Sequence, residues 1–329
     1  MKKIFLASFI VLLSLFFSAC SLIYPGIKND TDGTHIYDSE NDIQYSNNFE
    51  VKHVFLIGLD GWGGYSFNSS DFIMPTIQSI LPNSAYTLKA LSVYPPPVQS
   101  LPNWSSMFMG AGPDLTKYYT NNDIHPNSVY KDKYGLFPSI FSLMKDQQPD
   151  NKVAFFYEWP TLGYLCPSGG VIDRKQRFAP DTGRDYDSAI KTIANYIKSD
   201  KPNLMVIAID EPDEIGHEYN WYSKEYNALL TKIDGNISTI IEAIKDAGIW
   251  DDSVLIFTAD HGGLKDGHWD NTPQEREIPI IITGKCVKSG FKITGSAMIY
   301  DVAATIAYVL QLKVPAYWQG KALDAFIEN

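Results

Sequence analysis

The sequence predicts an α/β fold with a mostly parallel, doubly wound sheet that helices cover on both faces. Short apolar runs rich in β-branched residues alternate with amphipathic helical segments, which is typical of buried parallel strands and their crossover helices. The expected strands are residues 54–59, 153–157, 204–209, 254–258 and 278–283. The roughly 280 residues after position 50 are enough for one large domain of this kind.

Three segments carry apolar residues at helical spacing. The longest runs from 224 to 247 and is followed by Gly248, a residue that commonly ends helices. Residues 186–199 and 300–310 have the same periodicity. Another helix is expected to begin near Asn103, once the prolines before it have been passed.

The N-terminus is typical of an exported protein. Two lysines after the initiating methionine precede an apolar run over residues 4–17, and small residues then lead to Cys20. This resembles a bacterial lipoprotein signal, with residues 1–19 removed and Cys20 lipidated; an ordinary signal peptide or an uncleaved anchor are the alternatives. Residues 20–48 are polar and are expected to form a flexible tether. The body, residues 49–329, would then be anchored to a bacterial membrane in the cell envelope, facing the periplasm or the cell surface.

Charge and cysteine usage narrow the possible partners. The formal net charge of −11 argues against binding to a nucleic acid polymer, which requires a basic surface. Cys166 and Cys286 remain after the predicted processing, and neither lies in a CxxC pattern. A disulfide between them and two separate thiols are both left open.

Polar residues follow three of the predicted strands. Asp60 comes directly after residues 54–59, Asp213 follows 204–209, and Asp260 with His261 follows 254–258. Since ligands of open α/β sheets gather at the carboxyl ends of strands, we expect these side chains to meet at one edge.

Further candidates lie close to these in the chain. Asp213 and His217 are four residues apart and share one helix face, and His268 follows seven residues after His261. Ser100 precedes a predicted helix start, where backbone N–H groups would face an anion. Each segment alone also fits an ordinary turn, a helix cap or a surface histidine. Together, three aspartates, three histidines and one hydroxyl form a set that can ligate two metal ions.

In this order, the segments resemble the alkaline phosphatase superfamily and, within it, the nucleotide pyrophosphatase/phosphodiesterase-type branch. The matching motifs are Asp60-Gly61, Ser100-Leu101-Pro102-Asn103, Glu211-Pro212-Asp213 with Gly216-His217, Asp260-His261-Gly262, and Gly267-His268. The resemblance covers most of residues 51–325. It implies an alkaline-phosphatase-like fold in which residues 125–185 are a small insertion that forms a cap and shapes the substrate pocket.

The resemblance also implies a set of metal ligands. One zinc ion would be held by Asp213, His217 and His268, and the other by Asp60, Asp260, His261 and the oxygen of Ser100. Histidine and carboxylate ligands without thiolate suit zinc, with manganese or iron as alternatives.

Ser100 would then be the nucleophile and would form a phosphoserine intermediate. Many members of the branch carry threonine where this chain has Ser100, which still supplies a hydroxyl. The resemblance further implies that Asn103 and the backbone N–H of Leu101 bind a phosphate oxygen.

The implied function is that of an exported, metal-dependent phosphoric ester hydrolase, a phosphodiesterase or nucleotide pyrophosphatase. Its substrate would be a nucleotide, a lipid head group or a similar phosphate ester. No Arg or Lys lies within a ligand motif, which favours diesters over the more highly charged monoesters. A phosphomonoesterase or a phosphoryl or phosphoethanolamine transferase would use the same fold. A non-catalytic surface-binding lipoprotein is the alternative from a different class. A sulfatase is disfavoured because the segment at Cys166 lacks the Cys/Ser-x-Pro-x-Arg motif.

Overall fold

The computed structural model describes residues 27–29, 35–37, 42–178 and 186–327. The predicted signal peptide and Cys20 lie outside these ranges. Among the described residues, no helix combines the length and the apolar character that crossing a membrane requires.

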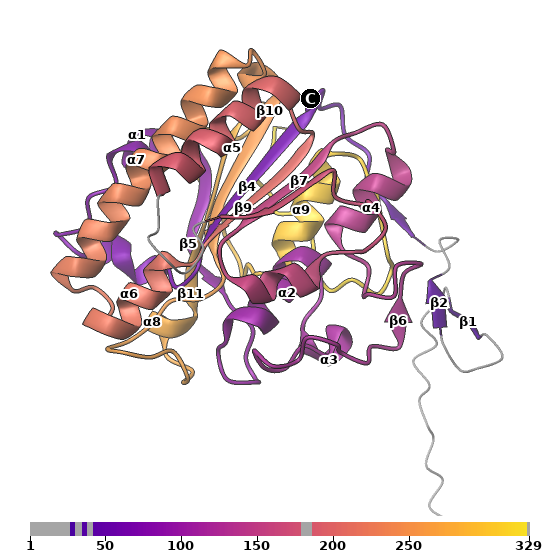
Figure 1. The fold of residues 1–329 in the computed structure, drawn as a ribbon, viewed down its shortest axis with the longest axis horizontal. Coiled ribbons are helices and arrows are strands. Elements are labelled where there is room, and N and C mark those ends of the chain that lie inside the picture. Colours follow the sequence, from indigo (N-terminus) through magenta and orange to yellow (C-terminus); the bar gives the residue numbers. More distant parts are fainter. Residues whose placement is uncertain (1–26, 30–34, 38–41, 179–185, 328–329) are drawn as a thin grey trace, which may run out of the picture.

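The core of the fold is an eight-stranded sheet (Figure 1). Its strands, in spatial order, are β12 (Phe291–Lys292), β5 (Ala85–Leu91), β11 (Glu277–Gly284), β10 (Ser253–Ala259), β4 (His53–Leu59), β9 (Leu204–Ile209), β7 (Val153–Tyr157) and β8 (Arg174–Arg177). The strands from β10 to β8 run parallel to one another, whereas β11 is antiparallel to both of its neighbours. All five predicted strands are present, so the prediction of a mostly parallel sheet is confirmed.

Strands β4, β7, β9 and β10 are buried along their whole length, which explains why their sequences read as continuous apolar runs. Strand β5 was not predicted. It lies near the edge of the sheet, is only partly buried, and carries Thr87 and Lys89 among its apolar residues. A strand of this composition has no strong periodic signal.

Helices cover the two faces of the sheet in separate layers (Figure 1). One layer consists of α1 (Pro75–Ile80), α5 (Tyr186–Asp200), α6 (Glu211–Tyr219) and α7 (Lys224–Asp246). The other consists of α2 (Ser100–Met109), α4 (Ile140–Gln147) and α9 (Asp301–Val309), while α3 (Pro113–Thr116) and α8 (Pro273–Arg276) are single turns. The doubly wound arrangement is therefore confirmed, and α7 ends just before Gly248, whose φ is 69°.

The structure corrects the expectation of a cap formed by residues 125–185. Within this range, β7 and β8 belong to the central sheet, and α4 packs against α2 and α9. The segment is thus mostly part of the fold itself. Its Tyr- and Pro-rich composition reflects the loops that join these elements.

The predicted tether also contains ordered pairings. β2 (His35–Tyr37) lies between β1 (Ile27–Asn29) and β6 (Tyr130–Lys131), and β3 (Ile43–Gln44) pairs with β13 (Lys313–Val314). Parts of residues 20–48 therefore dock on the body instead of running free of it.

The two cysteines of the body are not bonded to each other. Cys166 is buried and Cys286 is half-buried, and both are free thiols. Burial raises the pKa of the Cys166 thiol to about 12. This thiol is accordingly not reactive at neutral pH.

Candidate active site and metal centre

The predicted site residues meet at the carboxyl edge of the sheet. Asp60 directly follows β4, and Asp260 and His261 directly follow the neighbouring strand β10. Asp213 and His217 lie on α6, which begins two residues after β9. Three adjacent parallel strands thus bring the candidate ligands to one place, as the sequence predicted.

His261 is the centre of the first group of ligands. Its Nε2 lies 3.4 Å from Asp60 Oδ1 and 3.3 Å from Asp260 Oδ2. The hydroxyl of Ser100 donates to the same nitrogen over 3.2 Å. All four side chains are buried. Asp60, Asp260 and His261 form one of two groups in the described chain whose ligand atoms lie close enough together to hold a metal ion.

Asp213 is the centre of the second group. Its Oδ2 lies 3.4 Å from Nε2 of His217, and its Oδ1 lies 3.5 Å from Nε2 of His268 and 3.9 Å from that of His261. Asp213, His261 and His268 form the other group that could hold a metal ion. His217 borders it, because its Nε2 lies 3.1 Å from that of His268.

All three histidines are oriented by the backbone. Nδ1–H of His217 donates to the carbonyl of Asp266 over 2.7 Å, that of His261 to its neighbour Gly262 over 2.8 Å, and that of His268 to Val98 over 2.9 Å. With Nδ1 protonated, Nε2 presents a lone pair to the site whenever the imidazole is neutral. Metal-binding histidines are commonly held in this way.

Whether a cation fits this site can be judged from three carboxylate oxygens. Asp60 Oδ1, Asp213 Oδ1 and Asp260 Oδ2 are buried and have no hydrogen-bond partner. The second oxygen of Asp60 accepts from the indole of Trp104, and that of Asp260 accepts from the backbone N–H of Gly61 and of His261. Because an unpaired buried carboxylate oxygen is costly, this arrangement fits divalent cations between the oxygens and the Nε2 atoms.

The electrostatics of the carboxylates agree with this fit. Burial, together with the neighbouring carboxylates, raises the pKa values of Asp60 and Asp260 well above their usual range. Burial also acts to raise the pKa of Asp213, but the hydrogen bond with His217 and the nearby histidines outweigh it and lower the pKa. A cation would favour the ionised form of all three carboxyls.

The three histidines also differ in the direction of their pKa shifts. The hydrogen bond with Asp213 raises the pKa of His217 to about 9. Burial lowers the pKa of His261 to about 3 and also lowers that of His268. The two buried imidazoles are therefore neutral near pH 7, which is the form that binds metals.

Ser100 is the first residue of α2, and Gln99 before it is extended. The helix thus begins three residues earlier than predicted, because Pro102 falls in the first turn, where proline is tolerated. This places the Ser100 hydroxyl at the positive end of a ten-residue helix.

The side-chain amide of Asn103 is hydrogen-bonded to the backbone and, unlike the Ser100 hydroxyl, makes no hydrogen bond with the candidate metal ligands. Asn103 is fully buried; its Oδ1 accepts from the N–H of Val93 over 2.8 Å, and its Nδ2 donates to the carbonyl of Gln99 over 2.8 Å. The N–H of Leu101 donates to Asn121 Oδ1 over 2.9 Å. The predicted contacts of Asn103 and Leu101 with phosphate therefore stay predictions.

Asn121 is a residue that the sequence did not reveal. Its contact with Leu101 brings its amide to the first turn of α2, next to Ser100, and no described residue accepts a hydrogen bond from its Nδ2. It lies in a polar run, Thr120–Asp123, that reads as an ordinary loop. Only the fold brings this loop next to Ser100.

Trp221 supports the second group of ligands. Its indole N–H and the hydroxyl of Tyr226 both donate to the carbonyl of Gly61 over 2.8 Å. The ring packs edge-on against His217 with 5.0 Å between centroids. A buried side chain thereby ties the segment after β4 to the histidine on α6.

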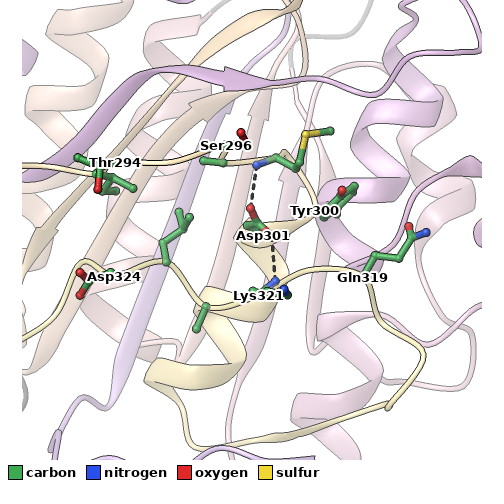
Figure 2. Close-up of a pocket in the computed structure, with 12 residues that line it drawn as sticks. Thr294, Ser296, Tyr300, Asp301, Gln319, Lys321 and Asp324 are labelled. Atoms are coloured by element: carbon green, nitrogen blue, oxygen red, sulfur yellow. Dashed lines mark hydrogen bonds between the residues drawn. The ribbon is translucent and has the colours of Figure 1, made fainter.

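A separate cavity of about 350 Å³ lies between the segments 293–301 and 319–324 (Figure 2). Its central carboxylate, Asp301, accepts the N–H of Met298 over 2.8 Å and that of Lys321 over 2.9 Å. None of the predicted ligands lines this cavity. Asp301 therefore joins two segments of the chain, and the candidate metal centre lies elsewhere.

The fold and the site define an alkaline-phosphatase-like protein. Murine ectonucleotide pyrophosphatase/phosphodiesterase 5 in complex with AMP superimposes with a TM-score of 0.64 at 13% identity, covering 79% of this chain and 95% of that one. A 2-O GAG sulfatase superimposes with a TM-score of 0.64 at 12% identity, covering 83% of this chain and 73% of that one. These two likenesses show the fold.

Sequence comparison shows the family. Residues 54–266, more than half of the chain, match the family described as type I phosphodiesterase / nucleotide pyrophosphatase. The chain belongs to this family of the alkaline phosphatase superfamily.

Among curated relatives, human ectonucleotide pyrophosphatase/phosphodiesterase family member 1 is 23% identical over 239 residues, 68% of this chain and 25% of the relative. GPI ethanolamine phosphate transferase 1 of Candida glabrata is 24% identical over 320 residues, 86% of this chain and 34% of the relative. The chain therefore spans only a quarter to a third of the length of these relatives.

Proposed function

We propose that the protein is a metal-dependent phosphodiesterase that uses Ser100 as its nucleophile. The observation that carries the proposal is the cluster beside Ser100 of buried carboxylate oxygens without hydrogen-bond partners and of histidine Nε2 atoms, of which that of His261 accepts from the Ser100 hydroxyl. The residues that would hold two divalent ions, most simply zinc, are Asp60, Asp260 and His261 with Ser100 on one side, and Asp213, His217 and His268 on the other. Ions held there would lower the pKa of the Ser100 hydroxyl and offset negative charge on the phosphate.

The chain's own residues carry out the displacement. The Ser100 hydroxyl gives its proton to water, and Oγ forms a bond to phosphorus. The bond from phosphorus to the leaving oxygen breaks on the opposite side; its electron pair stays on that oxygen, which takes a proton from solvent. A water then attacks the phosphoserine, the bond from phosphorus to Oγ breaks, and Ser100 regains a proton. Ser100 lies at the positive end of α2, so the dipole of this helix would offset part of the charge that develops on the phosphate oxygens.

The amides near Ser100 complete this arrangement. The free Nδ2 of Asn121, whose Oδ1 binds Leu101 N–H, is placed to donate to a phosphate oxygen. Asn103, one turn further along α2, holds the segment at Val93 in place. We assign the phosphate contact first to Asn121, with Asn103 as the supporting residue.

A transferase is the second candidate, because the matched relative from Candida glabrata is a GPI ethanolamine phosphate transferase. The first displacement would be the same. In the second, an acceptor alcohol would take the phosphoryl group from Ser100 in place of water. The two candidates are distinguished by adding an alcohol such as glycerol during turnover and identifying the products by mass spectrometry. A transferase forms the phosphate ester of the alcohol, whereas a hydrolase forms the product of reaction with water.

The experiment that tests the proposal compares bis(para-nitrophenyl) phosphate with para-nitrophenyl phosphate, using the purified full-length chain supplied with zinc. We expect the diester to be cleaved at least about tenfold faster. A faster monoester would make the protein a phosphatase. Retained full activity in the double variant Asp260→Ala/His217→Ala would refute the metal-dependent assignment.

We also propose that the protein is lipid-anchored at Cys20 in a bacterial cell envelope. The support is the basic start, the apolar run and the small residues before Cys20. Labelling cells with an alkyne fatty acid should mark the wild-type chain and leave Cys20→Ala unlabelled. Equal labelling of both would contradict the anchor.

A further inference from the structure

Trp269 is the one exposed tryptophan of this chain. All seven tryptophans lie in the described ranges, and Trp269 is 53% exposed, whereas Trp62, Trp104, Trp221 and Trp318 are buried and the other two are half-buried. Leaving an indole in water forgoes a large hydrophobic gain. Its position directly after His268 makes the exposure informative.

The indole is part of a stack of aromatic rings that leads to the nucleophile. Its ring lies 4.6 Å from that of His268 at an angle of 29°, and His268 in turn lies 3.9 Å from His261 at 20°. Two rings nearly parallel to His268 cannot share one of its faces, so Trp269 covers the face turned away from His261. The outer face of the indole is the exposed end of this stack.

The neighbouring glycine allows this position. A Cβ at residue 267 would lie 2.9 Å from Nε1 of Trp269, which is too close for an undisturbed contact. With Gly267 the indole can fold back over His268. The geometry is thus built into the loop and does not arise from a side chain that merely extends into solvent.

The stack also fixes the side of the site on which Trp269 lies. Ser100 Oγ contacts His261, whereas Trp269 packs on His268 and has its ring 6.2 Å from that of His217. In an in-line displacement, the leaving oxygen departs opposite to the attacking Oγ. The group attached to that oxygen therefore passes the Asp213 side, where Trp269 lies.

We propose that the exposed face of Trp269 stacks on the aromatic ring of the leaving group, such as an aryl ring or the base of a nucleoside, and so determines which esters the site prefers. The inference rests on the proposed function and adds a substrate class to it. When the bond from phosphorus to oxygen breaks, its electron pair stays on the departing oxygen, and the indole holds the ring attached to it. Stacking of a base on an aromatic side chain contributes enough to change affinity by about tenfold or more.

The test compares the affinities of two ligands, one with its ring on the leaving oxygen and one with its ring on the part of the ester that stays on phosphorus. Binding is measured in the Ser100→Ala variant with zinc present. In methyl para-nitrophenyl phosphate the ring is on the leaving oxygen. In trifluoroethyl phenylphosphonate the ring is bonded to phosphorus and cannot leave. Calorimetry should show that Trp269→Leu weakens the first ligand about tenfold and the second less than about twofold. Trp269→Phe, which keeps a smaller ring, should lie between.

The matched control is Tyr219→Leu, because Tyr219 is an exposed aromatic residue on the same helix as His217 and is 42% exposed. It should leave both affinities unchanged. Zinc content, measured by elemental analysis, shows whether each variant keeps its metal centre. Trp269→Phe retains a ring over His268 and serves as the test if Trp269→Leu loses metal.

Several results would overturn the inference. Equal weakening of both ligands would mean that Trp269 only supports His268, and weakening of the phenylphosphonate alone would place it on the retained side. Unchanged affinity for both would show that the indole touches neither. A larger loss for choline methyl phosphate than for the aryl ester would assign the face to a cation. If the wild type binds the aryl ester through Trp269 but cleaves neither compound, the proposed function fails, and of this inference only the aryl-binding face of Trp269 remains.

Discussion

The indole N–H of Trp104 donates to Oδ2 of Asp60 over 2.9 Å, and both residues are buried. Trp104 lies on α2, four residues after Ser100, so this bond joins the helix that carries Ser100 to Asp60, which follows β4. The two elements approach closely at Gly58, where a Cβ would lie only 2.4 Å from Cη2 of the indole. Because Oδ2 is held in this way, Oδ1 is left to face His261.

We therefore expect Trp104→Phe to lower metal affinity by about 10- to 100-fold, since it removes the donor that orients Asp60. Zinc titration by calorimetry measures this. Trp318→Phe is the matched control, because the indole N–H of Trp318 is buried and makes no hydrogen bond. Equal affinity in the wild type and in Trp104→Phe would show that the bond does not position Asp60.

Asp260→Asn should separate stability from metal binding. The amide oxygen can still accept from Gly61 and His261, whereas the loss of one charge relieves the repulsion with Asp60. We expect the chelator-treated variant to be more stable than the chelator-treated wild type by about 2 kcal/mol. It should also lose the stabilisation that zinc gives the wild type. Thermal unfolding with and without zinc measures both effects, and a less stable chelator-treated variant would contradict the prediction.

The pH dependence of stability has a definite sign in the presence of a chelator. Folding raises the pKa of His217 to about 9 and raises those of Asp60 and Asp260, so the folded state binds more protons than the unfolded state. Stability should therefore fall as pH rises from about 7 to 9. His261 and His268, with lowered pKa values, act in the opposite sense and only below their ordinary value of 6.5.

Urea unfolding at several pH values with EDTA tests this expectation. His217→Gln removes one of the raised pKa values and should flatten the slope. A rise in the stability of the wild type over the same range would contradict it.

Asn121 and Asn103 should behave differently on substitution. Asn121→Ala removes an amide beside Ser100 and should lower kcat about 10- to 1,000-fold, while the loss of its bond to the N–H of Leu101 lowers the unfolding free energy by only about 1 kcal/mol. Asn103→Ala leaves the N–H of Val93 without its partner and removes one of the two donors to the carbonyl of Gln99, so it should lower the unfolding free energy by about 2–4 kcal/mol. Steady-state rates and urea unfolding of both variants give the answer. The reverse pattern would restore Asn103 as the phosphate ligand.

The sequence was sufficient to predict the position of a site residue where that residue directly follows a strand. Asp60, Asp260 and His261 lie directly after buried apolar strands, and parallel pairing then brings them together whatever the loops do. The stripe of apolar residues along α7 likewise predicts both ends of that helix to within a residue or two.

The sequence was insufficient where position depends on loops and on partly exposed segments. Asn121 reaches α2 through a polar loop, and β5 mixes polar with apolar residues near the edge of the sheet. The cap predicted for residues 125–185 was wrong in most of its length, because the Tyr- and Pro-rich loops obscured the core elements α4 and β8. Trp104 and Trp269 gave no separate signal, since an isolated tryptophan next to a motif is more often a packing residue.

The most direct test of the central claim is the turnover of bis(para-nitrophenyl) phosphate by Ser100→Ala at a zinc content matched to that of the wild type. Ser100→Thr, which keeps a hydroxyl, is the control and should retain activity within about tenfold. The account predicts that Ser100→Ala retains its zinc and its ligand binding and loses turnover by at least about 1,000-fold. Turnover by Ser100→Ala close to that of the wild type would contradict the assignment of Ser100 as the nucleophile.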